Sequence, residues 1–471
     1  MTTHARRLSS ERGSILVQVG VAIIVLIAFT TFVADYGLMW VARRQAQNAA
    51  DAGALAGAIA LGYDDFSDRS NAGAAKQSAH NVAIANYVAA EAPKVDIDAD
   101  VYFYPDDPTK FPDECADDTC IRVDVYRNQA ANNPLPIWFG QLIGLVDQGV
   151  QATAIARAAF GNASDCLKPW AVVDRWEEHW EDGAAVTFPP NSWNEESNFD
   201  KYDKDGNQIL FPPNADVYTP AQVTYTDTDG DGEGDTPDWS TYIPGSGFHP
   251  FDFDGSGNVA GYTDDYGLAY SLKQGDAGDW NFGAGWFMRL DLSGLVNPDA
   301  EYEYEPPSNQ GADFYRWAIK NCVGTTIKIG EEIPFIDNAT GSATGPTRQG
   351  VATDGANDSS GPSLINQDPT AMWVDPDGPG GTPGYVDSPF AISPRIVAVP
   401  LINPDALMQA FKNGRTTVPI GNIAGFFIEG VTGSGVNQVV TGRLMTMPGL
   451  KAEGEDTNAP STFMRIITLI R

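Results

Sequence analysis

The sequence predicts an α+β protein: an N-terminal transmembrane helix extends into a small α+β domain, and a β-rich outer domain with calcium-type loops follows. Three observations predict this fold class. An uncharged apolar segment lies near the start, and an alanine-rich stretch without proline follows it. The rest of the 471 residues alternates short apolar runs with turns rich in the 48 glycines and 32 prolines. A chain of this length is expected to form two or three domains.

The chain is strongly acidic, with 29 Lys and Arg against 62 Asp and Glu, a formal net charge of −33. Residues 1–44 hold five basic and two acidic side chains, a net charge of +3, so the remainder carries 24 basic and 60 acidic ones, a net charge of −36. A nucleic-acid-binding protein needs a basic surface to displace the counterions of phosphates. The composition therefore argues against nucleic acid as a partner and favours cations.

The first predicted element is a transmembrane helix over residues 13–34, which contain no charged side chain. At about 1.5 Å per residue this segment spans about 33 Å, enough to cross a hydrocarbon core of about 30 Å. Arg6, Arg7 and Arg12 precede it. Because basic residues stay on the cytoplasmic side, residues 1–12 are expected to form a cytoplasmic tail and the bulk of the chain to be periplasmic or extracellular. A cleaved signal peptide is the alternative, although its apolar region would be shorter, about 7–15 residues.

The helix is expected to continue beyond the membrane through residues 35–61, because alanine has the best helix propensity and proline is absent there. This part of the chain carries an ordered polar pattern, Arg12-Gly13-Ser14, then Asp35-Tyr36-Gly37, then Arg43-Arg44-Gln45-Ala46-Gln47-Asn48-Ala49-Ala50-Asp51-Ala52 continuing to Ala58. The pattern resembles the N-terminal signature of the TadE/TadG-like proteins of the Flp (tight adherence) pilus machinery. The resemblance implies a single-pass protein of the bacterial inner membrane, whose partners are the lipid bilayer and other Flp/Tad pilus proteins.

Two features depart from related families. Type IV pilin-like precursors are cleaved after a glycine that is followed five residues later by Glu, whereas Gly13 is followed there by Gln18. Cleavage after Gly13, and with it entry into the filament, stays open at this point. Many TadG-like proteins also resemble von Willebrand A domains with a D-x-S-x-S metal site, but the nearest sequence here is Asp291-Leu292-Ser293-Gly294-Leu295. A von Willebrand A domain is therefore not expected.

Residues 35–161 are predicted to form the first domain, and its order of elements is similar to that of small pilin-like domains. After the long helix, we expect a helix over residues 70–91, strands over 95–103 and 121–125, a helix over 135–146 and a strand over 150–160.

Residues 162–471 are predicted to form a β-rich outer domain of sandwich or mixed type with few helices. Turn residues dominate there, and the clearest strands are expected at residues 394–400, 423–429, 439–445 and 463–470.

Calcium is the expected cofactor of the outer domain. Ca²⁺ takes six to eight oxygen ligands, and carboxylates at loop positions 1, 3 and 5 followed by Gly at position 6 wrap the chain around one ion. The candidate ligands of the first loop are Asp227, Asp229, Asp231, Glu233, Asp235 and Asp238, and those of a weaker copy are Asp252, Asp254, Ser256 and Asn258. A third loop starts at Asp203 but lacks the glycine at position 6. The flanks are not helical, so an EF-hand fold is not expected. The alternative to calcium binding is a set of flexible acidic or Asx-rich turns.

The four cysteines, Cys115, Cys120, Cys166 and Cys322, lie in the part expected outside the membrane, where an even number favours disulfides. Cys115 with Cys120 would close a small loop, and Cys166 with Cys322 would link distant parts of the outer domain. Buried free thiols are the alternative. A zinc site is less favoured because the C-x-x-C spacing and a neighbouring His pair are both missing.

No catalytic residues are expected, because the sequence contains neither G-x-S-x-G nor a phosphate-binding G-x-x-x-x-G-K-[ST] motif. The resemblance implies a membrane-anchored structural or assembly component, minor pilin-like, of a pilus used in surface adherence. The alternative is an envelope-anchored carbohydrate-binding adhesin or hydrolase, in which Trp176, Trp180 and Trp193 would line a sugar groove.

Overall fold

The structure is a computed structural model. It describes residues 11–63, 68–104, 106–112, 115, 119–138, 141, 144, 147–179, 193–194, 197–203, 205–211, 215–226, 236–275, 282–308, 311–336, 343–354, 358–374, 384–390, 392–413, 416–452 and 461–470. The chain divides into two compact units. The first consists of Met1–Leu61, Asp68–Arg157 and Thr468–Arg471, and the second of Gly62–Ser67 and Ala158–Ile467.

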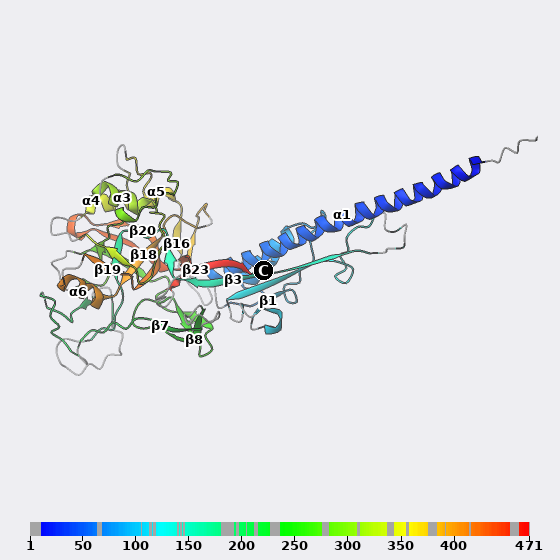
Figure 1. The fold of residues 1–471 in the computed structure, drawn as a ribbon. Helices are drawn as coiled ribbons and strands as arrows, with labels where there is room; N and C mark the ends of the chain where they lie inside the picture. Colours follow the sequence, from blue (N-terminus) through cyan, green and yellow to red (C-terminus); the bar gives the residue numbers. More distant parts are fainter. Residues whose placement is uncertain are drawn as a thin grey trace, which may run out of the picture. The chain divides into compact units, whose positions relative to one another are not determined.

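The first unit is built on α1 (Glu11–Tyr63), one continuous helix of 53 residues that Figure 1 shows in blue. The predicted continuation of the N-terminal apolar helix through residues 35–61 is therefore confirmed. Its two halves differ in exposure: apolar side chains from Ile15 to Phe29 are exposed, whereas alanines of the second half are fully buried. The buried alanines are Ala42, Ala46, Ala49, Ala50, Ala54 and Ala58.

The second half of α1 packs against α2 (Ala74–Ala85) through small residues on both helices. Ala75, Ala79 and Ala83 of α2 are fully buried. Gly53 and Gly57 of α1 lie opposite them: a Cβ atom at Gly53 would lie 2.8 Å from Cβ of Ala83, and one at Gly57 would lie 2.8 Å from Cβ of Ala79. Glycines spaced by four residues therefore allow the two helices to approach closely, as in other helix pairs with small residues at the interface.

A sheet covers the same part of α1. β1 (Val101–Phe103) pairs antiparallel with β2 (Cys120–Arg127), and β2 pairs antiparallel with β3 (Val150–Gly161), with Val123 opposite Val101 and Ala154. The alternating burial of β3 confirms the period-2 pattern of its sequence. Along the chain, β3 begins in the first unit and ends in the second.

Three predicted elements of the first unit differ in the structure. The helix expected over residues 70–91 is shorter in the structure, where α2 begins at Ala74 and ends at Ala85. The strand expected over 95–103 contains only β1, because Asp96 accepts hydrogen bonds from the backbone N–H groups of Asp98 and Ala99 and turns the chain there. The helix expected over 135–146 is wrong at its start, since Leu135 forms a bridge with Gln148.

The second unit contains a closed six-stranded barrel of order β11-β13-β5-β18-β20-β21. Most neighbouring strands are antiparallel, but β18 is parallel to β5 and β11 is parallel to β13. A sandwich was one expectation for this region, and the barrel differs from it because the sheet closes on itself. The strands are β5 (Trp170–Val173), β11 (Ala269–Gln274), β13 (Trp286–Arg289), β18 (Ile396–Ile402), β20 (Asn422–Thr432) and β21 (Val439–Met445).

One hydrophobic cluster takes residues from all six strands of the barrel. Its members include Trp170, Leu272, Phe287, Val399, Phe426 and Leu444, all at most 2% exposed. A polar chain lies within the same buried region: the indole N–H of Trp170 donates to the hydroxyl oxygen of Tyr315 at 2.9 Å, and that hydroxyl lies 3.1 Å from Oγ1 of Thr347. These bonds satisfy polar atoms that would otherwise destabilise the core.

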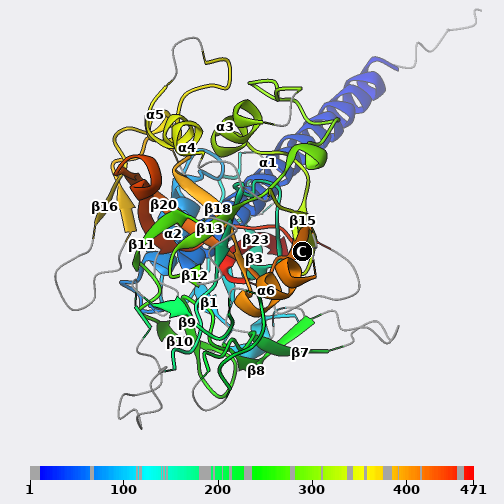
Figure 2. The ribbon, with the colours of Figure 1, turned by 90° about the vertical axis from the view of Figure 1, so that its left-hand side faces the viewer.

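The second unit also contains helices that the sequence did not predict. α3 (Ala312–Lys320), α4 (Thr344–Val351) and α5 (Leu364–Gln367) lie together beside the barrel, whereas α6 (Pro404–Lys412) lies apart from them (Figures 1 and 2). They are at most nine residues long, so their apolar periodicity is too short to stand out. The start of α6 does carry a signal: Asn403 caps it by accepting from the backbone N–H of Asp405, and Pro404 follows at the first helical position.

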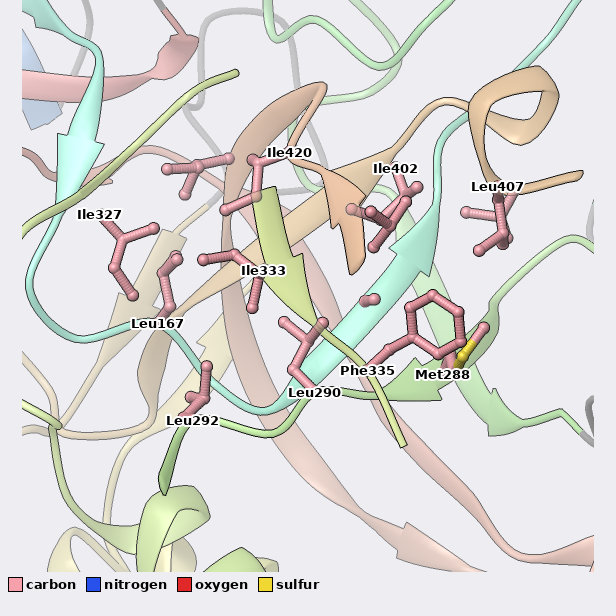
Figure 3. Close-up of a cluster of buried hydrophobic side chains, with 14 of the residues drawn as sticks. Leu167, Met288, Leu290, Leu292, Ile327, Ile333, Phe335, Ile402, Leu407 and Ile420 are labelled. Atoms are coloured by element: carbon pink, nitrogen blue, oxygen red, sulfur yellow. The ribbon is translucent and has the colours of Figure 1, made fainter. Parts of the chain in front are cut away.

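A second hydrophobic cluster packs outside the barrel strands. Figure 3 shows part of it, with Leu290 and Ile333 in the same group as Ile402 of β18 and Leu407 of α6. All four side chains are at most 2% exposed. The outer surface of the barrel is therefore covered by apolar contacts, which explains why its strands are apolar on both faces.

The remaining strands form small pairs. Hairpins join β7 (Gln222–Thr226) to β8 (Thr236–Ile243) and β9 (Phe251–Phe253) to β10 (Val259–Tyr262). The other pairs are β4 (Ala163–Ser164) with β14 (Ile327–Lys328), β6 (Asn198–Phe199) with β12 (Phe282–Gly283), β15 (Glu332–Pro334) with β19 (Thr417–Pro419), and β16 (Met372–Val374) with β17 (Gly384–Val386). β22 (Met447–Pro448) and β23 (Ser461–Ile470) pair parallel and are the last two strands of a five-stranded sheet of order β1-β2-β3-β23-β22. Short 3₁₀ turns lie at Pro108–Lys110, Ser293–Leu295 and Gly435–Asn437.

Candidate functional site

The N-terminal half of α1 is long and apolar enough to cross a membrane. A window of 18 residues within Ile15–Tyr63 has a mean hydropathy of 2.6, and none of that window is buried inside the protein. Apolar side chains such as Leu16 and Ile24 are 77% and 67% exposed. Side chains this apolar are exposed without cost only in a lipid or protein environment.

The charged residue that ends this apolar segment, Asp35, is only 7% exposed. One of its carboxylate oxygens, Oδ1, accepts a hydrogen bond of 3.1 Å from the backbone N–H of Trp138. Beyond it on α1, the indole N–H of Trp40 donates to the hydroxyl of Tyr36 at 3.1 Å, and the guanidinium of Arg44 lies 5.3 Å from the centre of the Trp40 ring. Aromatic and basic side chains thus gather where the apolar segment ends.

The first predicted calcium loop lies mostly outside the described residues, which omit 227–235 and therefore Asp227, Asp229, Asp231, Glu233 and Asp235. Asp238 is described and belongs to β8, at the end of the hairpin that flanks the loop. Its Oδ1 atom accepts hydrogen bonds from the backbone N–H and the hydroxyl of Ser240, at 3.1 and 2.6 Å. This carboxylate therefore takes part in a local turn.

The second predicted loop, residues 252–258, covers the end of β9, which includes Asp252, and the tight connection from β9 to β10. Oδ1 of Asp254 accepts hydrogen bonds from the backbone N–H groups of Ser256 at 2.8 Å and Asn258 at 2.9 Å. These bonds lower the pKa of Asp254 below its ordinary value, and the bond from Asn258 has the largest effect. The loop is held by its own hydrogen bonds, as in an Asx turn.

The third loop has the same hydrogen-bond pattern. Oδ1 of Asp203 accepts from the backbone N–H groups of Asp205 at 2.9 Å and Asn207 at 2.8 Å. In both loops the side-chain amide of the asparagine donates back to the aspartate, and the glycine between them has a positive φ of 70° or 82°. The structural repeat is therefore D-x-x-G-N, which aligns Asp203 with Asp254. Asp252, the first candidate ligand of the second loop, lies two residues before the start of this repeat.

The four cysteines lie in two disulfides, Cys115 with Cys120 in the first unit and Cys166 with Cys322 in the second. The first closes a loop of sequence separation 5, and the second links residues 156 positions apart. In the part of the chain that the structure describes, no three His, Cys, Asp or Glu side chains form a group that could hold a metal ion.

The tryptophans considered for a sugar groove are core residues where they are described. Trp176 is 2% exposed, and its ring packs edge-on against Trp193 and Phe199, with centroids 6.2 and 5.5 Å apart. Trp180 lies outside the described residues. Trp176 and Trp193 therefore contribute to packing rather than to an open aromatic surface.

A cavity of about 250 Å³, which no sequence pattern predicted, lies in the second unit at the end of β5 and β18. Tyr218, Tyr242 and Phe248 line it together with Asp174, whose carboxylate accepts hydrogen bonds from the Tyr218 hydroxyl and the backbone N–H of Phe248, both 2.9 Å. Burial raises the pKa of Asp174 to about 6 and raises that of Tyr218 well above its ordinary value. The only sequence feature is an acid directly after the apolar run Trp170–Val173.

Comparison with known proteins identifies the N-terminal segment. Residues 13–60 match the Tad family model, which describes Flp pilus-assembly TadE/G-like proteins. The predicted resemblance to this family is therefore confirmed for that segment, which coincides with almost the whole of α1. No curated protein and no solved structure matches the chain.

Proposed function

We propose that the chain is a single-pass, membrane-anchored structural or assembly component, minor pilin-like, of a Flp/Tad-type pilus used in surface adherence. The observation that carries the proposal is the coincidence of the TadE/G-like match at residues 13–60 with one unbroken helix, Glu11–Tyr63. That helix has an exposed apolar half and a half buried against its own unit through alanine and glycine. An anchor joined rigidly to a folded domain suits a protein that must be held at the membrane while it contacts other pilus proteins.

The charge distribution and the disulfides support an inner-membrane protein whose bulk is periplasmic or extracellular. Arg6, Arg7 and Arg12 precede the apolar segment, and basic residues are retained on the cytoplasmic side. Both cysteine pairs lie in the acidic remainder of the chain, and disulfides persist in oxidising compartments outside the cytoplasm. The proposed partners are the lipid bilayer and other Flp/Tad pilus proteins, and the proposal assigns no catalytic role.

We also propose that calcium binds the loop formed by residues 227–238. It carries a carboxylate at every second residue from position 227 to position 235, and these carboxylates repel one another without a cation. The loops at Asp203 and Asp254 are held by their own hydrogen bonds, so the proposal gives them a smaller share of any calcium effect.

Deletion of the gene tests the proposed pilus function. We expect the deletion strain to lose surface pili and attachment to a solid surface, and a plasmid copy of the full chain to restore both. A periplasmic reporter enzyme fused after residue 471 should be active, and the same reporter fused after residue 10 should be inactive. Unchanged pili and attachment in the deletion strain would contradict the pilus role, whereas an inactive C-terminal fusion would contradict the orientation.

A further inference from the structure

A group of exposed aromatic side chains lies where the apolar half of α1 ends. Tyr36 is 46% exposed and Trp40 is 53% exposed, on one face of the helix because they are four residues apart. Trp138, from a distant part of the first unit, is 70% exposed. We call these three residues the aromatic platform. Exposed aromatic rings on residues this near the end of the apolar segment need an environment that accepts both their apolar bodies and their polar edges.

Hydrogen bonds at Trp138 and at the residues that precede it fix the position of its backbone. Its backbone N–H donates to Oδ1 of Asp35, 103 residues earlier, at 3.1 Å. Leu135 pairs with Gln148, and the side-chain amide of Gln148 donates to the carbonyl oxygen of Pro136 at 2.7 Å. The connection that carries Trp138 is therefore held at the level of Asp35, the first charged residue after the apolar segment.

The helix rise gives the depth of each residue. If the hydrocarbon core ends near Ala34, Tyr36 and Trp40 lie about 3 and 9 Å beyond it, at about 1.5 Å per residue. The headgroup layer is about 5–7 Å thick on each side of a bilayer. Tyr36 and Trp138 therefore lie within this layer and Trp40 at its outer edge, the region where membrane proteins concentrate Trp and Tyr.

Basic residues follow immediately. Arg43 lines a groove of about 230 Å³ between α1 and the start of β3, together with Tyr36, Trp40 and Gln151. The guanidinium of Arg44 lies 5.3 Å from the centre of the Trp40 ring. Both arginines lie about 13–15 Å beyond Ala34, and the headgroup layer extends to about 5–7 Å beyond it. Their distance from the headgroups is therefore about 6–10 Å, which is comparable with the Debye length of about 8–10 Å. Guanidinium groups bind phosphate oxygens in a bidentate manner.

We propose that the aromatic platform inserts into the outer headgroup layer of the membrane that α1 crosses, and that Arg43 and Arg44 bind anionic phospholipid headgroups beside it. The occupant is lipid rather than another protein, because the surface is continuous with the apolar segment and combines exposed Trp and Tyr with two cations. This inference rests on the membrane anchoring in the proposed function. It adds a second attachment that holds the first unit against the bilayer surface.

Site-directed spin labelling of the full chain in lipid nanodiscs tests the platform. The four native cysteines lie in disulfides, so Trp138→Cys introduces one reactive thiol. We expect a nitroxide there to be several-fold less accessible to a water-soluble nickel chelate than one at Tyr87→Cys, a matched position that is 63% exposed in the same unit. It should also be accessible to oxygen. Equal nickel accessibility at 138 and 87 would contradict the proposal, and protection from both reagents at 138 would show a protein cover instead.

A label at Ile24→Cys separates this inference from the proposed anchor. If the nitroxide at 24 is shielded from nickel and accessible to oxygen while that at 138 is exposed to water, the anchor stands and the platform is wrong. If the nitroxide at 24 is itself accessible to nickel, the membrane anchor fails and the platform fails with it.

The role of the arginines is tested by lipid preference. Spin-labelled anionic phospholipid should associate with the full chain more strongly than its zwitterionic counterpart, and Arg43→Gln with Arg44→Gln should reduce that preference by up to about five-fold per arginine. Lys94→Gln removes one exposed charge elsewhere in the first unit and should leave the preference unchanged. A double arginine variant with the preference of the wild type would overturn the headgroup contact.

Discussion

Gly57 of α1 lies directly against Ala79 of α2: a Cβ atom at Gly57 would lie 2.8 Å from Cβ of Ala79 and 2.6 Å from Cδ1 of Ile121. Such distances require a neighbour to move. The close approach lets the small face of α2 bury itself completely, since Ala75, Ala79 and Ala83 have no exposed surface. The first unit therefore depends on a residue without a side chain near the C-terminal end of its longest helix.

Gly57→Ala should destabilise the first unit by about 1–3 kcal/mol, the usual cost of overpacking a core. Gly37→Ala is the matched control, because a Cβ atom at Gly37 meets nothing within 4 Å. It should stabilise α1 slightly, since alanine is the better helix former by about 1 kcal/mol. Hydrogen exchange of α2 amides in the full chain measures both effects. Equal protection of α2 in the two variants would contradict the packing.

The long-range disulfide should contribute more to stability than the short one. In the chain-entropy treatment, loops with the separations of 156 and 5 residues correspond to about 5 and about 2 kcal/mol. Denaturant unfolding of Cys166→Ala with Cys322→Ala should therefore show a larger loss than that of Cys115→Ala with Cys120→Ala. The reverse order would show that local contacts rather than chain entropy decide the contribution of these bonds.

Asp174 should make the second unit less stable as the pH rises from about 4 to about 6. Burial raises its pKa to about 6 in the folded chain, above the ordinary value of about 4, so the folded state holds more protons than the unfolded state in that window. The stabilising, protonated form is present below pH 4 and is lost through pH 6, at a cost of about 3 kcal/mol. Asp174→Asn should remove this slope. The measurement is the difference in unfolding free energy between the wild type and the variant, determined at pH 4 and at pH 7. The same difference at both pH values would contradict the assigned role of Asp174.

Calcium should raise the melting temperature of the second unit. At a free concentration about 100 times the dissociation constant, binding adds about 2.7 kcal/mol, which corresponds to about 5 °C for a unit of this size. The full chain in detergent should show this rise in calcium relative to chelator, and Asp229→Asn should abolish it. Asp254→Asn should lower the melting temperature equally in both conditions, because this carboxylate accepts backbone N–H groups. Identical melts of the wild type in calcium and chelator would contradict the calcium site.

The sequence predicted best where one pattern extends over many residues. The 53 residues of α1, the alternating strand β3 and the long apolar strand β23 have patterns that local propensity alone can reveal. The barrel was not predicted, because the parallel pairing of Leu401 with Val172 depends on residues more than 200 positions apart. The short helices were missed because burial of Trp317 and Leu407 in the core, rather than propensity, stabilises them.

For the candidate sites, the TadE/G-like signature was readable because its residues are consecutive. The aromatic platform was not, because Trp138 reaches α1 through one hydrogen bond to Asp35. The repeat shared by the loops at Asp203 and Asp254 was not readable from the calcium spacing, because the hydrogen-bond pattern from Asp254 to Asn258 and the positive φ of Gly257 define it.

The parallel pairing of β5 with β18 in the barrel has a consequence for folding during synthesis. β5 is made early, but it pairs with β18, and the barrel closes only after β21 at Val439–Met445 has followed. At about 5–20 residues per second, β5 waits roughly 15–55 s for the last strand. Until then, its unpaired edges and the apolar side chains of Trp170 and Val172 are open to other chains. Survival of the nascent second unit therefore depends on protection from aggregation during this interval.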